Sequence, residues 1–167
     1  MSDLDEVINA LVLDRDLVLR FFGAFSRFEY SLKRSGFLVA GSNDQAQANW
    51  DSYANSLHGK FQVVQDSEFK SAVELLLNRP PKKQVVSNGH LDWRGTPRGN
   101  GERDENYILR LVKIVRNNLF HGGKYPDPPG PVEDIGRDLQ LIKASIVVLI
   151  CCLQLSDNVR AVFEDTA

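Results

Sequence analysis

The sequence predicts an all-α fold, an up-and-down bundle of about five helices with one long loop or small hairpin insertion. Two observations support this prediction. Apolar residues recur at three- and four-residue steps along successive segments, which is the period of an amphipathic helix. Ser, Asn, Asp, Gly and Pro gather between those segments, where helices begin and end.

The length and composition favour a single domain over residues 1–167. The chain is 43% hydrophobic and 25% charged, which is ordinary for a globular protein. Its formal net charge is -2, so no overall positive field would attract nucleic acid. Any contact with RNA must therefore be local.

The sequence also predicts a cytoplasmic protein without membrane contact. The first ten residues, MSDLDEVINA, carry acidic groups where a secretory signal would be basic. The most apolar run, Ala144 to Leu155, is shorter than the roughly 20 residues that span a bilayer. The adjacent Cys151 and Cys152 lie inside this run and indicate a reducing compartment.

A long first helix is expected from about Leu4 to Leu32, where apolar residues follow the helical period, and Gly36 should end it. The turn residues from Gly41 to Asp44 then predict the N-cap of a second helix. That helix should run through Trp50, Tyr53 and Leu57.

Asp66 and the residues after it should open a third helix, which Pro80 and Pro81 terminate because proline cannot continue the hydrogen-bond ladder. Residues 80–104 form a long segment rich in Gly, Pro, Asn and Arg. Within it, the strand-like stretches 84–86 and 90–93 flank a Ser-Asn-Gly turn, which predicts a small hairpin.

The fourth helix is expected from Asp104 to Phe120, followed by Gly122 and Gly123. A Pro-rich stretch leads to a fifth helix from about Glu133 to Leu155. A short tail helix should follow over residues 159–163.

Polar side chains converge at the end of the fourth helix. Asn117 and His121 are four residues apart and should be neighbours on one face, together with Arg110. Arg116 is displaced around the helix, but its long side chain can reach the same site. Apolar residues also occur away from the core stripe of this helix, so we expect a second packing surface, with a homodimer partner as the simplest occupant.

This residue set suits cleavage of an RNA phosphodiester by proton transfer. Histidine titrates near neutral pH and can act as a general acid or base, while arginine can clamp a phosphate with its fork of donors. Asn117 would orient His121 or the ribose. A structural interpretation stays open, because Arg116 and His121 in the last turn would also satisfy helix carbonyls and the helix dipole.

No cofactor or metal site is expected. His58 and His90 have no acidic or cysteine companions at ligand spacing, and the glycine pairs do not follow strands of a nucleotide-binding unit. The basic side chains of residues 80–104 are candidates to guide a phosphate backbone, although a solvated loop has the same composition. Trp93 either stacks on a base or anchors the hairpin.

The segment Arg116 to Lys124, which reads RNNLFHGGK, resembles the signature of HEPN domains. These are small helical bundles, many of them metal-independent endoribonucleases marked by Arg, a polar residue and a His a few residues later. The similarity extends to three further stretches: Arg27-Phe28-Glu29, Pro80 to Gln84 and Leu91-Asp92-Trp93.

The resemblance implies that Arg116 and His121 are the catalytic pair, that Asn117 assists them, and that two protomers build a composite cleft. The basic residues of the same helix end, Arg110, Lys113 and Lys124, are expected to contact RNA. Glu29 and Tyr125 are candidate supporting residues, Glu29 as a carboxylate partner of Arg116 or His121 unless it is simply exposed.

One departure concerns control of such an enzyme. HEPN toxins that a nucleotidyltransferase antitoxin neutralises carry Tyr two residues after the His, where this chain has Gly123, and Tyr125 is out of register. The leading hypothesis is a homodimeric toxin or defence endoribonuclease, with an antitoxin or regulatory protein as a further partner. The alternatives are a non-catalytic HEPN module that binds RNA, a nucleotide or a protein, and a helical scaffold.

Overall fold

The computed structural model describes residues 13–121 and 135–165. Over these ranges the chain forms six α-helices, two 3-10 helices and two antiparallel hairpins, in the following order: α2 Arg15–Arg34, β1 Leu38–Ala40, η1 Ser42–Asp44, β2 Ala46–Ala48, α3 Trp50–Ser56, η2 Phe61–Val63, α4 Ser67–Asn78, β3 Lys83–Ser87, β4 His90–Arg94, α5 Asp104–Phe120, α6 Ile135–Gln154 and α7 Asp157–Glu164. The predicted start of the first helix and the segment after His121 lie outside the described residues.

The prediction of an all-α bundle of about five helices is therefore wrong. The described residues are mostly helical, but they form six helices, counting the tail helix, and two small antiparallel sheets, of which only the β3–β4 hairpin was predicted. Periodic apolar residues correctly identified the long helices. They could not reveal strands whose side chains are exposed on both faces of a hairpin, because such strands leave no pattern of burial in the sequence.

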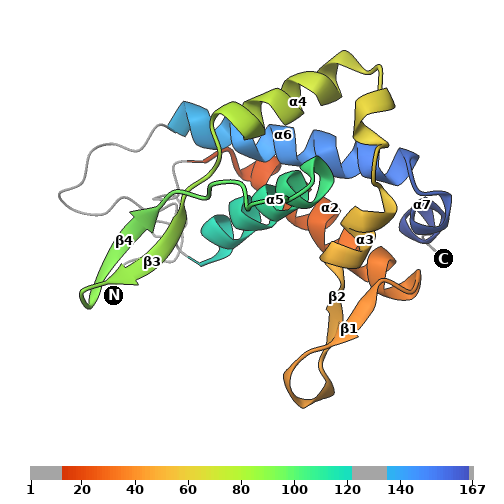
Figure 1. Ribbon diagram of the computed structural model, residues 1–167, viewed down its shortest axis with the longest axis horizontal. Helices are drawn as coiled ribbons and strands as arrows, with labels where there is room; N and C mark the ends of the chain where they lie inside the picture. Colours follow the sequence, from red (N-terminus) through yellow and green to blue (C-terminus); the bar gives the residue numbers. More distant parts are fainter. Residues whose placement is uncertain (1–12, 122–134, 166–167) are drawn as a thin grey trace.

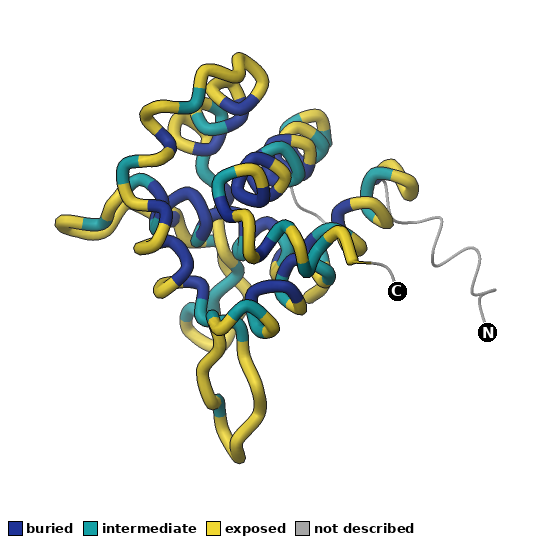
Figure 2. The backbone as a smooth tube through the Cα atoms, turned by 90° about the vertical axis from the view of Figure 1, so that its right-hand side faces the viewer, coloured by how far each residue is buried: buried dark blue, intermediate teal, exposed yellow. Residues whose placement is uncertain are grey.

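The helices pack around one hydrophobic core (Figure 1). Helices α2 and α6 lie against each other, α4 runs along α6, α7 packs on α2, and α5 lies against α3 on the side of the bundle that faces the reader. The buried core side chains come from all of these helices, and Figure 2 marks the buried residues in dark blue along the backbone. Each large apolar side chain buried in this way contributes about 1.5–3 kcal/mol, which is the main force holding the bundle together.

Aromatic residues fix α3 against α2. The Trp50 ring stacks on Phe25 and Phe28, with centroid distances of 5.2 and 5.4 Å. The buried Tyr53 meets Phe28 edge-on, and its hydroxyl donates a hydrogen bond to the Cys152 carbonyl of α6 at 3.0 Å. The short helix α3 is thus held by side chains from two long helices.

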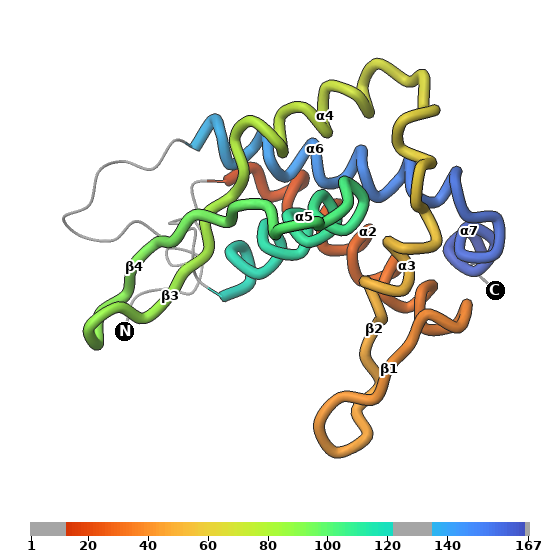
Figure 3. Tube along the Cα trace, in the orientation of Figure 1, coloured from red at the N-terminus to blue at the C-terminus, as the bar shows by residue number. Residues whose placement is uncertain are grey.

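The second predicted helix begins later than expected. Residues 38–48 form the β1–β2 hairpin, which extends away from the body of the protein (Figure 3). Its turn contains Asn43 and Asp44 at φ values of 55° and 59°, so these residues reverse the chain and do not cap a helix. Helix α3 is capped instead by Asn49, whose side chain accepts from the Ser52 N–H at 3.0 Å.

The first predicted helix is also corrected, because Leu13 and Asp14 are not helical and α2 begins at Arg15, with Asp14 as its N-cap. The remaining predicted elements agree with the structure where they fall on described residues. Helix α4 is capped by Asp66, which accepts from the Phe69 N–H at 2.7 Å. The β3–β4 hairpin turns at Asn88 and Gly89, both at positive φ, as a tight two-residue turn requires. Helix α5 has the predicted bounds, and α7 is the expected tail helix.

In the described ranges no single helix has the length and apolar character needed to cross a membrane. By length and composition alone, α6 and α7 satisfy that requirement together, as a pair bent by 112°.

Candidate functional site

Arg116 is half-buried near the end of α5 and is held by aromatic rings. Its guanidinium carbon lies 5.6 Å from the centre of the Phe25 ring and 5.1 Å from that of Phe120, within the range of cation–π attraction. Nη1 donates a hydrogen bond to Oδ1 of Asn117 at 3.1 Å. No carboxylate among the described residues forms an ion pair with Arg116, so most of its N–H donors remain available to an anion.

His121 is the first residue after α5 and is exposed. Its backbone N–H donates to the Asn117 carbonyl at 2.9 Å, which closes the last helical turn and fixes where the side chain starts. No described residue forms a hydrogen bond with its imidazole. Within the described part of the chain, neither ring nitrogen has a hydrogen-bond partner.

The side chain of Asn117 forms a hydrogen bond with Arg116 in this structure. Its amide oxygen accepts from the guanidinium, while its backbone carbonyl accepts from His121. Asn117 thus contacts both members of the pair, although its side chain makes no hydrogen bond to the imidazole.

Glu29 and Lys113 belong to the surroundings of Trp50. Glu29 lies on α2, and its Oε1 accepts from the Trp50 indole N–H at 2.9 Å. The Lys113 ammonium lies 6.0 Å from the centre of the Trp50 ring. Neither contact reaches Arg116 or His121, so the role expected for Glu29 as their carboxylate partner has no counterpart in the observed hydrogen bonds.

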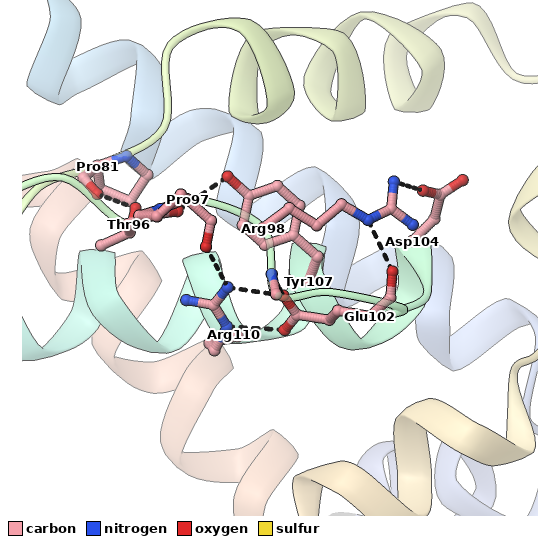
Figure 4. A network of polar contacts seen from close by, with 9 residues as sticks. Pro81, Thr96, Pro97, Arg98, Glu102, Asp104, Tyr107 and Arg110 are labelled. Carbon is pink, nitrogen blue, oxygen red and sulfur yellow. Dashed lines mark hydrogen bonds and ion pairs between the residues drawn. The ribbon is translucent and has the colours of Figure 1, made fainter.

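Arg110, which was expected to contact RNA, is engaged within the protein (Figure 4). Its Nε and Nη2 donate to the two carboxylate oxygens of Glu102 at 2.8 and 2.7 Å, and Nη2 also donates to the Pro97 carbonyl at 3.0 Å. The hydrogen bonds from Arg110 hold the pKa of Glu102 below its ordinary value. This pair clamps residues 97–102 onto α5, and it leaves Arg110 few donors for a phosphate.

Asn118 is a residue that the sequence analysis did not single out. It is buried, and its amide nitrogen donates to the Lys82 carbonyl at 2.6 Å. The two preceding carbonyls are also bound by side chains: Pro81 accepts from Thr96 at 2.6 Å, and Pro80 accepts from Arg137 at 2.7 Å. Three consecutive carbonyls at the entrance to β3 are thus fixed by three different parts of the chain.

The one sequence signal for this anchor was the Pro80-Pro81 pair. The helix ends before these prolines, so the carbonyls that follow it accept no hydrogen bond from the N–H groups of the helix. Where such carbonyls are buried, they need donors from elsewhere in the chain. An amide side chain on the inner face of a helix, such as Asn118, is a suitable donor, but its partner cannot be read from spacing.

The two cysteines are buried in α6 and are both free thiols. Burial raises the pKa of Cys151 to about 11, and it raises that of the fully buried Cys152 well above its ordinary range. No group of three or more His, Cys, Asp or Glu side chains suited to a metal ion occurs in the described part of the chain. Lys124 and Tyr125, two further candidate site residues, lie outside that part.

Comparisons of the chain with protein-family models, with curated proteins and with solved structures found no match in any of the three.

Proposed function

We propose that this protein is a metal-independent endoribonuclease of the HEPN type, with Arg116 and His121 as its catalytic pair. One observation carries the proposal. Arg116 has no carboxylate partner among the described residues and is positioned by two aromatic rings and Asn117, five residues before an exposed imidazole. An arginine that only stabilised the fold would gain from a carboxylate, as Arg110 does.

In the proposed reaction the ribose 2′-oxygen attacks the adjacent phosphorus. A general base removes the 2′-proton, and a general acid protonates the 5′-oxygen as its bond to phosphorus breaks, which leaves a 2′,3′-cyclic phosphate and a 5′-hydroxyl. His121 serves one of these steps, because imidazole exchanges protons near neutral pH. Arg116 binds the non-bridging oxygens and stabilises the extra negative charge of the transition state.

A second copy of the chain would supply the other proton-transfer group. Exposed apolar side chains support such a partner: Leu19 is 68% exposed, Phe22 46% and Phe120 43%, and the last two rings are in contact at 5.3 Å. Phe120 is also a ring on which Arg116 rests. A homodimer across this surface would bring two Arg116–His121 pairs together, and its mass in solution is a simple check.

A non-catalytic module that binds RNA, a nucleotide or a protein is the second candidate. It is favoured by the absence of any hydrogen bond between a described side chain and the His121 imidazole, since the ring of a catalytic histidine is commonly oriented through its second nitrogen. Toxin or defence activity and control by an antitoxin or regulatory protein are extensions of the first proposal.

Cleavage of end-labelled RNA in EDTA separates the two candidates. The wild type and His58→Ala, a matched control at an exposed histidine elsewhere, should give the same products. His121→Ala should lower the rate by about 10²-fold or more, as loss of a general acid or base does. Arg116→Lys should also be severe, because lysine keeps the charge but cannot grip two phosphate oxygens.

Two outcomes would contradict the enzyme. Equal cleavage by His121→Ala would assign the activity to another site or to a contaminant. No cleavage by a folded wild type that still binds RNA would leave the binding module.

A further inference from the structure

The β3–β4 hairpin places two cations directly opposite each other. Lys83 pairs with Arg94 across the strands, both side chains are exposed, and Lys82 precedes them. Like charges at opposed positions destabilise an antiparallel pair. An anion bound between the two cations would offset their repulsion and stabilise the hairpin.

No described carboxylate forms an ion pair with either cation, and Asp92, the acidic residue of the hairpin, offsets only one of the two charges. Neither Lys83 nor Arg94 forms an ion pair or a side-chain hydrogen bond with a described residue. Asp92, two residues before Arg94 on the same face, uses its carboxylate to accept from the Trp93 backbone N–H at 2.7 Å. The hairpin therefore presents a net positive surface on a chain whose formal net charge is -2.

The hairpin is fixed to the helix that carries the candidate catalytic pair. Asn118 follows Asn117 and precedes His121 by three residues, and its hydrogen bond to the Lys82 carbonyl joins α5 to the residue before Lys83. The bonds from Thr96 and Arg137 hold the two carbonyls before it. The two cations thus start from a rigid base next to the end of α5, where Figure 1 shows the hairpin projecting.

We propose that the β3–β4 hairpin is a substrate arm, in which Lys83 and Arg94 bind a backbone phosphate of the RNA strand that is cleaved at Arg116 and His121. The identification of the bound anion as an RNA phosphate rests on the proposed function. The existence of an anion site rests only on the two opposed cations. A phosphate held here extends the contact with the strand beyond the reacting phosphodiester. It adds affinity that depends on salt and not on base sequence.

An anionic membrane surface would present the same phosphate chemistry. Val86 and Leu91, opposed near the tip of the hairpin, are 76% and 57% exposed and would suit insertion among lipids. They lie on the face opposite Lys83 and Arg94, however, because side chains alternate along a strand. RNA is favoured because the cations are tied through Asn118 to the turn of α5 that carries the candidate catalytic residues.

The test measures binding of a fluorescein-labelled single-stranded RNA by anisotropy in EDTA, at several salt concentrations. All proteins carry His121→Ala so that the RNA stays intact. Lys83→Ala/Arg94→Ala is compared with Arg34→Ala/Lys143→Ala, which removes the same charge from exposed positions on α2 and α6. The hairpin variant should lower the slope of log K against log salt by about 0.7, the value for loss of one single-strand phosphate contact. The control should keep the parent slope.

Each result decides the proposal separately from nuclease activity. A reduced slope in the hairpin variant alone supports the arm, even if the wild type never cuts RNA. An unchanged slope, or no RNA binding by the parent, overturns it, even if the wild type is a nuclease. Binding to vesicles containing phosphatidylserine that requires Lys83 and Arg94, without binding to RNA, would also overturn it and assign the hairpin to a membrane surface.

Discussion

Replacing Arg110 with alanine should destabilise the fold by about 1–2 kcal/mol and leave RNA binding nearly unchanged. The change removes two charge-assisted hydrogen bonds to Glu102 and one hydrogen bond to the Pro97 carbonyl. Hydrogen bonds to charged groups contribute about 1.5–3 kcal/mol when shielded and exposed pairs under about 1 kcal/mol. The side chains of Arg110 and Glu102 are 37% and 17% exposed, so the value should fall between these limits.

Urea unfolding followed by circular dichroism would measure this loss. For a domain of this length, the same change lowers Tm by about 2–8 °C. A double-mutant cycle with Glu102→Gln should give a coupling energy of about 1 kcal/mol between the two side chains, since they touch directly.

The pH dependence of the same cycle gives an independent check. The pKa of Glu102 is lowered in the folded state, mainly by hydrogen bonds from Arg110, from an ordinary value of 4.5. Between the lowered pKa and the ordinary one, the unfolded chain binds more protons than the folded protein. The stabilisation from Glu102 is therefore complete above about pH 4.5 and is lost as pH falls through the folded pKa, whereas Glu102→Gln should lack this component.

A wild-type free energy of unfolding for Arg110→Ala, together with weaker RNA binding, would contradict this prediction. Arg110 would then serve the substrate, as the sequence suggested, and its contacts with Glu102 would carry little energy.

Two further predictions concern buried groups. Asn118→Ala should cost about 1–3 kcal/mol in the free energy of unfolding, because the Lys82 carbonyl loses its donor, whereas Asn117→Ala, an exposed change on the same turn, should cost under about 0.5 kcal/mol. Equal losses in urea unfolding would show that the anchor is weak. Cys151 and Cys152 should react with a thiol-specific disulfide reagent at pH 8 only as fast as the protein opens, because burial raises both pKa values; labelling at the rate of an unfolded control would contradict their burial.

Local signals predicted most of the helices. Asp66 caps α4, the prolines at 80 and 81 follow its end, and the apolar period of α5 with the Gly122-Gly123 pair after it indicated that helix. The turn at Asn88 and Gly89 gave the β3–β4 hairpin, because those two residues adopt positive φ at low cost.

The β1–β2 hairpin was missed for a physical reason. Its strands are short and lie mostly exposed, so they lack the alternation that burial of one face imposes. Asn43 and Asp44 are as common in tight turns as at helix caps, and only their positive φ decides between the two. Because Asn and Asp are typical of both helix N-caps and tight turns, these residues alone could not show which of the two occurs here.

The contacts of the candidate site could be predicted where all the residues belong to α5, but not where one partner lies in a distant segment of the chain. Arg116, Asn117 and His121 lie close together because of spacing within α5 and its last turn. Arg110 was assigned to RNA because its partner, Glu102, sits in an irregular segment whose path spacing does not give. Asn118 reaches a carbonyl 36 residues away, which no local pattern can indicate.

The two arginines of α5 thus have different partners, and this difference bears on function. Arg110 faces a carboxylate that accepts two of its donors, so its charge is neutralised within the fold. Arg116 rests on two apolar rings, which attract its charge without occupying its N–H groups. A guanidinium oriented in this way is prepared for an anion, because binding requires neither the breaking of an ion pair nor the ordering of a free side chain. Lys83 and Arg94 also lack carboxylate partners in the described structure, and the hairpin that carries them is tied through Asn118 to the last turn of α5.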